Sequence, residues 1–72
     1  MQFKQLVSIT TALKSPFTLT KVAISLAKPC TRKRFVCGYK AVEALRTMKL
    51  NPETFYGADV TDDNGVVVAE LE

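Results

Sequence analysis

A turn sequence near the carboxyl end, DDNG at residues 62–65, restricts the fold of this chain more than any other feature. Asp, Asn and Gly are the residues that tight turns require, because they accept backbone conformations that other residues avoid. The flanking runs, residues 55–61 and 66–71, are rich in β-branched and apolar side chains. This combination predicts a two-stranded antiparallel β-hairpin.

The pairing of the two hairpin strands can be predicted from the side chains that it would bring together. If Thr61 lies opposite Val66, apolar residues of both strands collect on one face. A shift of two residues would instead place Asp59 opposite Glu70, and a directly opposed pair of like charges is destabilising. We therefore predict the first register, with the reservation that a bulge at Gly65 would change the faces.

The rest of the chain favours helices. The clearest helix covers residues 39–50, where Ala41, Val42, Leu45 and Met48 form an apolar stripe at helical spacing. Residues 3–14 and 18–27 each fit a helical face and also an alternating strand pattern, and the spacing of their apolar residues slightly favours helices. The predicted fold class is therefore α+β, with a small helical unit followed by the carboxyl-terminal hairpin.

The length and the charge pattern describe a small binding domain. Residues 1–72 can form one domain only, and a chain of this size buries about 60% of its surface on folding, so a partner or a second copy could supply the missing burial. Residues 1–50 contain ten Lys and Arg and one acidic residue, a net charge of +9. Residues 51–72 contain six acidic residues and no basic one, a net charge of −6. Such polarity is typical of electrostatic docking, although the two parts could also neutralise each other.

Enzymatic chemistry is not expected. The chain has no histidine, the commonest general base and metal ligand, and no glycine-rich phosphate loop. Residues 59–70 partly match a calcium-binding loop, but Asn64 stands where the sharp turn needs glycine. We predict no catalytic residue, no metal and no cofactor.

The compartment is predicted to be the cytoplasm. No apolar run approaches the ~20 residues of a membrane-spanning helix, and the amino terminus lacks the pattern of a secretory signal. Two cysteines, Cys30 and Cys37, are too few for a secreted disulfide scaffold, so we expect small buried thiols in a reducing environment.

Residues 28–47 have the length and spacing of a helix-turn-helix unit. Phe35, Cys37, Val42 and Leu45 fall where the two helices of such a unit touch, and a turn would lie just before Tyr39. This region resembles the helix-turn-helix DNA-binding family, and the hairpin resembles the wing of its winged-helix branch. The sequence departs from the family at Arg32, where a small alanine is usual, and at Val36, where the turn glycine is usual.

The resemblance implies a small regulator, of the size found in phages and mobile elements, that binds double-stranded DNA. The second helix would present Gly38, Tyr39, Lys40 and Glu43 to base edges. Lys33, Arg34 and Arg46 would contact phosphates. The full nucleic-acid-binding set that the resemblance implies is Arg32, Lys33, Arg34, Tyr39, Lys40, Glu43 and Arg46.

A second hypothesis is a protein-binding modulator or inhibitor that docks on a host protein complex. Under this hypothesis the acidic hairpin contacts a basic partner surface and imitates the charge of nucleic acid. The residues expected to dock are Asp59, Asp62, Asp63 and Glu70. Two of them, Asp62 and Asp63, would repel phosphate at the tip of a DNA-binding wing, which favours this alternative.

Overall fold

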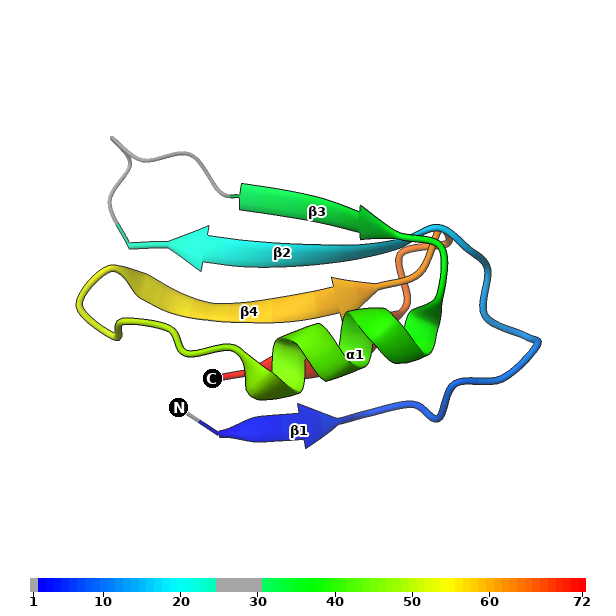
Figure 1. Ribbon diagram of the computed structural model, residues 1–72, viewed down its shortest axis with the longest axis horizontal. Helices are drawn as coiled ribbons and strands as arrows, with labels where there is room; N and C mark the ends of the chain where they lie inside the picture. The colour runs from blue at the N-terminus through cyan, green and yellow to red at the C-terminus, as the bar shows by residue number, and fades with distance from the viewer. Residues whose placement is uncertain (1, 25–30) are drawn as a thin grey trace.

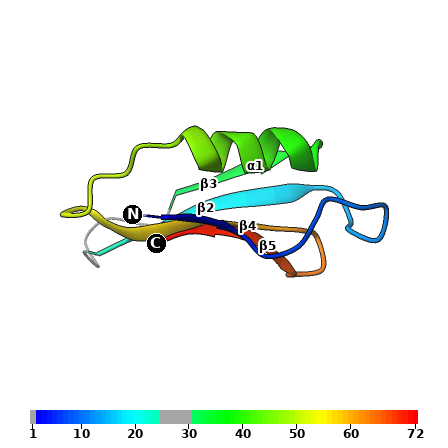
Figure 2. The same cartoon turned by 90° about the horizontal axis from the view of Figure 1, so that it is seen from below.

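The structure is a five-stranded antiparallel sheet with one helix packed on one of its faces (Figures 1 and 2). The computed structural model describes residues 2–24 and 31–72. The strands lie side by side in the order β1-β5-β4-β2-β3. Their bounds are Phe3–Gln5 for β1, Phe17–Ala23 for β2, Thr31–Phe35 for β3, Phe55–Thr61 for β4 and Val67–Leu71 for β5, and helix α1 covers Gly38–Thr47.

The predicted fold class, a helical unit followed by a separate hairpin, is therefore wrong. The hairpin of β4 and β5 does exist, but it forms the middle of the sheet: β4 also pairs with β2, and β5 also pairs with β1. For residues 2–24 and 31–72, Figure 2 shows α1 on one side of the sheet and no helix on the other. An antiparallel sheet can leave one face in water, so a single helix is enough to close the core.

Strand β2 occupies a segment for which the spacing slightly favoured a helix. Phe17 and Leu19 are buried, whereas Thr18 and Thr20, which alternate with them, are half-buried on the face without the helix. Alternation of this kind is the period of a strand, and β-branched threonines fit a pleated surface better than a helix. Residues 25–27 of the predicted helix lie outside the described residues.

The amino-terminal segment, residues 3–14, also is not a helix. Only Phe3–Gln5 form regular structure, as strand β1 along the edge of β5. The next residue, Leu6, is 44% exposed, so it does not contribute to a buried helical face. The backbone of Val68 in turn accepts hydrogen bonds from the amides of Leu6 and Val7. Pairing with β5 satisfies backbone groups that a free edge would expose, and this overrides a weak helical pattern.

Helix α1 confirms the clearest of the helical predictions, although it ends at Thr47 instead of residue 50. Its buried side is made by Gly38, Ala41, Val42 and Leu45. These residues pack on Phe17, Leu19, Val60 and Ala69 of the sheet to form the core. The apolar stripe read from the sequence is thus the face that the helix presents to the sheet.

The predicted register of the hairpin is wrong, and the structure contains the like-charge pair. Asp59 lies opposite Glu70, and a bulge after Val60 shifts the pairing so that Thr61 lies opposite Val67. The bulge allows the two consecutive residues Val68 and Ala69 to be completely buried. Burial of a valine side chain contributes about 1.5–3 kcal/mol, whereas an opposed pair of like charges costs less than about 1 kcal/mol. Core packing therefore decides the register.

Candidate nucleic-acid interface

Within the described part of the chain, the longest run of consecutive cations lies on β3, the edge strand that runs across the top of Figure 1. Arg32, Lys33 and Arg34 are consecutive, and all three are exposed. Because side chains alternate along a strand, Lys33 lies on the helix side of the sheet and the two arginines lie on the open face. The sheet tolerates these cations because side chains on an edge strand can reach water. Cations on an edge strand also discourage other strands from pairing with it.

Part of the segment predicted as the first helix of a helix-turn-helix unit is strand β3. Lys28, Pro29 and Cys30, at the start of that unit, lie outside the described residues. A run of three cations offers no apolar stripe to a helix, whereas at a sheet edge each cation can reach water. Three members of the predicted nucleic-acid-binding set, Arg32, Lys33 and Arg34, remain together, but on a strand.

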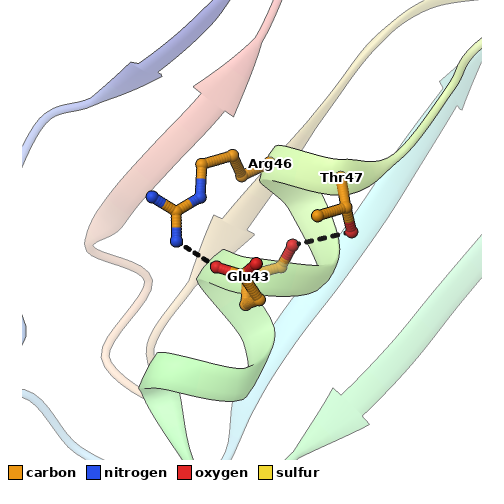
Figure 3. Close-up of polar contacts among 3 residues, drawn as sticks. All are labelled: Glu43, Arg46 and Thr47. Atoms are coloured by element: carbon orange, nitrogen blue, oxygen red, sulfur yellow. Dashed lines mark hydrogen bonds and ion pairs between the residues drawn. The ribbon is translucent and has the colours of Figure 1, made fainter.

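The helix residues of the predicted site divide into two groups. Lys40 is exposed. It lies four residues before Ala44, so the two share a helix face. Because Ala44 lines the same pocket as residues of β3, Lys40 is on the side of α1 that faces β3. Tyr39 is 68% exposed at the amino end of the helix. Glu43 and Arg46 form an ion pair with each other, and the carbonyl of Glu43 also accepts a hydrogen bond from Thr47 at 3.0 Å (Figure 3).

The cations near β3 are not neutralised by acidic neighbours. Within the described ranges, 2–24 and 31–72, the only ion pair is the one between Arg46 and Glu43. Arg32 and Asp59 are on the same face of the sheet, but Thr20 of β2 lies between them. Two strand spacings separate their backbones, roughly 10 Å. The positive charge of β3 is therefore available to a partner.

A groove lies between α1 and β3. Its volume is about 440 Å³, and its apolar wall is made by Leu19, Phe35, Ala44 and Met48. Lys21 and Lys33 line it from the helix side of the sheet, and Arg32 of β3 borders it although its side chain alternates to the open face. No acidic residue of the described chain lines the groove. The ammonium of Lys33 lies 5.3 Å from the centre of the Phe35 ring, a cation–π distance.

The groove could not be identified from the sequence, because the segments of β2 and β3, which form one side of it, were expected to be helical. Lys21 is two residues after Leu19 on β2, so both lie on the helix side of the sheet. Lys33 of β3, which pairs with Leu19, lies on the same side. The alternating pattern of residues 17–23 was the signal that could have placed Lys21 on the same face as the core. The ammonium of Lys21 also lies 5.9 Å from the centre of the Phe55 ring.

The acidic residues proposed for protein docking do not form one exposed patch. Asp62 is buried in the turn between β4 and β5, where its carboxylate accepts hydrogen bonds from the backbone amides of Lys14, Asn64 and Val66 at 3.2, 3.0 and 2.9 Å. Burial alone would raise the pKa of Asp62, but these backbone donors outweigh it and hold the pKa below its usual value. Asp62 therefore fixes the turn and the loop that contains Lys14.

The other three acidic candidates differ in exposure. Asp63 is exposed at the turn, whereas Asp59 and Glu70 are half-buried next to each other on the open face. Burial raises the pKa of Asp59. Lys4 of β1 lies opposite Glu70 on the same face. The β4–β5 side of the sheet is thus the acidic half of the molecule, and β3 is on the basic half.

Of the two cysteines, only Cys37 lies within the described residues. Cys37 is a free, exposed thiol at the amino end of α1, so the expectation of a buried thiol is wrong for it. It precedes the helix in an extended conformation, and the neighbouring Gly38 takes the buried position. Cys30 lies outside the described residues. No group of three potential metal ligands occurs in the part of the chain that the structure describes.

Comparison with known proteins gives no relative. No family model, no curated protein and no solved structure matches this chain. The resemblance to winged helix-turn-helix domains therefore has no support beyond the sequence spacing. Among the described residues, no helix has the length and apolar character needed to cross a membrane.

Proposed function

We propose that this chain is a small non-enzymatic regulator that binds nucleic acid through β3 and the adjoining side of α1. The observation that carries the proposal is the set of three consecutive exposed cations on an edge strand, without an acidic partner among the described residues. Lys21 extends this set on the groove side, and Lys40 is exposed on the neighbouring helix side. Phosphate contacts from such cations supply most of the affinity of non-specific binding.

The proposal replaces the mode of binding that the sequence suggested. A recognition helix must enter the major groove of DNA with its exposed face. The exposed face of α1 contains the pair of Glu43 with Arg46, in which the charge of the arginine is already matched. The strand β3 presents more unmatched positive charge, so it is the better candidate for contact with the phosphate backbone.

The double change Lys33→Ala and Arg34→Ala tests this proposal. Each phosphate contact that is lost reduces the slope of log K against log salt by roughly 0.9 on duplex DNA and about 0.7 on a single strand. We therefore expect weaker binding to all sequences, with a slope smaller by about 1.8 or about 1.4 respectively. The measurement is fluorescence anisotropy with labelled mixed-sequence oligonucleotides, titrated at several salt concentrations.

The matched control is the single change Lys4→Ala, compared with Lys33→Ala alone, so that each variant removes one positive charge. Lys4 lies on β1, at the opposite edge of the sheet from β3, so only a small loss of affinity is expected. Equal losses in the two single variants would show that the overall charge acts and not the β3 surface. An absence of binding by the unmodified protein at low salt, at tens of micromolar, would contradict nucleic-acid binding altogether, because non-specific binders reach about 10⁻⁴–10⁻⁶ M.

A second candidate function is docking on a protein through the acidic half, for which the pair of Asp59 and Glu70 is the relevant observation. Two opposed carboxylates cost stability in the isolated domain, and a basic partner surface would relieve that cost. The contribution of Asp62 to such docking is small, because its carboxylate is buried and bonded within the turn. In the anisotropy experiment, this function predicts that the unmodified protein does not bind oligonucleotides.

A further inference from the structure

The groove between α1 and β3 combines an apolar surface with a positively charged one. A ligand that uses both must contain an apolar group and a negative charge. One wall is apolar, with the ring of Phe35 and the side chains of Ala44 and Met48. The cations on the groove side are Lys21 and Lys33, and Arg32 borders the groove from β3. A volume of about 440 Å³ is within the range of sites that hold small organic groups, which is roughly 300–1,000 Å³.

We propose that this groove holds an unpaired base of a single-stranded nucleic acid, while the cations beside it hold the adjoining phosphates. This inference rests on the proposed function and specifies its ligand. Proteins that bind single strands combine a positively charged track for the backbone with side chains on which bases stack. Here a cation and an aromatic side chain are adjacent, because the ammonium of Lys33 lies 5.3 Å from the centre of the Phe35 ring.

A duplex fits this arrangement less well. Its bases are stacked inside the helix, so it can offer phosphates to β3 but cannot place a base against Ala44 and Met48 without the energetic cost of unpairing. An unpaired strand presents the base and the phosphates at no such cost. The apolar wall of the groove therefore contributes to affinity only for the single strand.

An acidic peptide with apolar side chains is the main competing occupant, since it could add to the free edge of β3 as a further strand. The cations favour the nucleic acid, because Arg32 and Arg34 on the open face and Lys33 on the groove side surround the edge strand on both faces. A strand of phosphates can follow cations on either face, whereas a peptide must alternate in register with them.

The test compares three labelled ligands of equal length by fluorescence anisotropy: an oligothymidine, the same backbone without bases, and a mixed-sequence duplex. An acidic oligopeptide of alternating Glu and Leu is included as the fourth ligand. Stacking of one base on a side chain is worth roughly a five-fold to hundred-fold gain in affinity. We expect the oligothymidine to bind more tightly than the abasic strand by a factor in this range, and more tightly than the duplex.

A variant that fills the groove without changing its charge makes the test specific. Ala44→Leu adds bulk at the apolar wall, and we expect it to reduce oligothymidine affinity to that of the abasic strand, which itself stays unchanged. Thr47→Leu adds an aliphatic side chain at an exposed helix position and is the matched control, expected to leave both affinities unchanged. Circular dichroism establishes that both variants are folded.

The outcomes separate the base site from the proposed function. Equal affinity for the oligothymidine and the abasic strand would overturn the base site and leave phosphate binding intact. Tighter binding of the duplex, or of the acidic peptide, than of the oligothymidine would also overturn it. Failure of all the nucleic acids to bind would overturn the proposed function itself.

Discussion

Replacement of Leu45 by alanine is expected to lower the free energy of unfolding by about 2–5 kcal/mol, as typical for a buried leucine. Leu45 is completely buried at the centre of the contact between α1 and the sheet, so the truncated side chain leaves a cavity. A domain of this length has a total stability of roughly 4–11 kcal/mol at about 0.05–0.15 kcal/mol per residue. The variant should therefore lose a large part of its stability.

The measurement is urea denaturation followed by circular dichroism. Leu6→Ala is the matched control, because Leu6 is 44% exposed and should lose less than about 1 kcal/mol. A loss of under half a kcal/mol at Leu45, or an equal loss at Leu6, would mean that α1 does not pack on the sheet as the structure has it.

The second large effect is expected at Gly57 of β4. A Cβ atom at this position would clash with the carbonyl oxygen of Leu71, which is backbone and cannot turn away. Gly57→Ala should therefore force the ends of β4 and β5 apart. Overpacking against side chains costs roughly 1–3 kcal/mol, and a clash with backbone of the central hairpin should reach at least the upper part of that range.

Gly65→Asn is the control for this change. Gly65 has a φ of +83°, which asparagine tolerates better than other side chains, and a Cβ there would meet nothing within 4 Å. Denaturant midpoints of both variants, with amide hydrogen exchange along β5, give the comparison. If Gly57→Ala unfolds at the same urea concentration as the unmodified protein, the close approach of β4 to β5 is not present in solution.

The parts of the fold that could be predicted from the sequence are those with strong local signals. The turn at residues 62–65 and the apolar stripe of α1 each satisfy a local rule that the tertiary structure keeps. The register of the hairpin could not be predicted, because the decisive contributions are the bulge and the burial of Val68 and Ala69. Both depend on neighbours that are distant in the sequence.

Strands β1, β2 and β3 were not predicted because their residues fit both patterns or neither. Phe17–Ala23 alternates as a strand but also places apolar residues at helical spacing. Thr31–Phe35 has only one partly buried apolar side chain, Phe35, and its pairing with β2 is what makes it a strand. An edge strand with three cations has almost no hydrophobic signal of its own.

The candidate site was predicted in part. Arg32, Lys33 and Arg34 were identified by their charge alone, and charge does not depend on whether the segment is a helix or a strand. The groove was not identified, because it needs Leu19 and Lys21 of β2 beside Ala44 and Met48 of α1. Only the tertiary structure brings those four residues together.

The central claim, that β3 and the adjoining side of α1 bind nucleic acid, is tested most directly by NMR titration of the ¹⁵N-labelled protein with an oligothymidine. We expect amide shifts to change over Thr31–Phe35, at Lys21 and along the side of α1 that contains Ala44. The amides of β5, on the acidic side of the sheet, should stay unchanged. Shift changes concentrated on β4 and β5, or none at any oligonucleotide concentration, would contradict the claim.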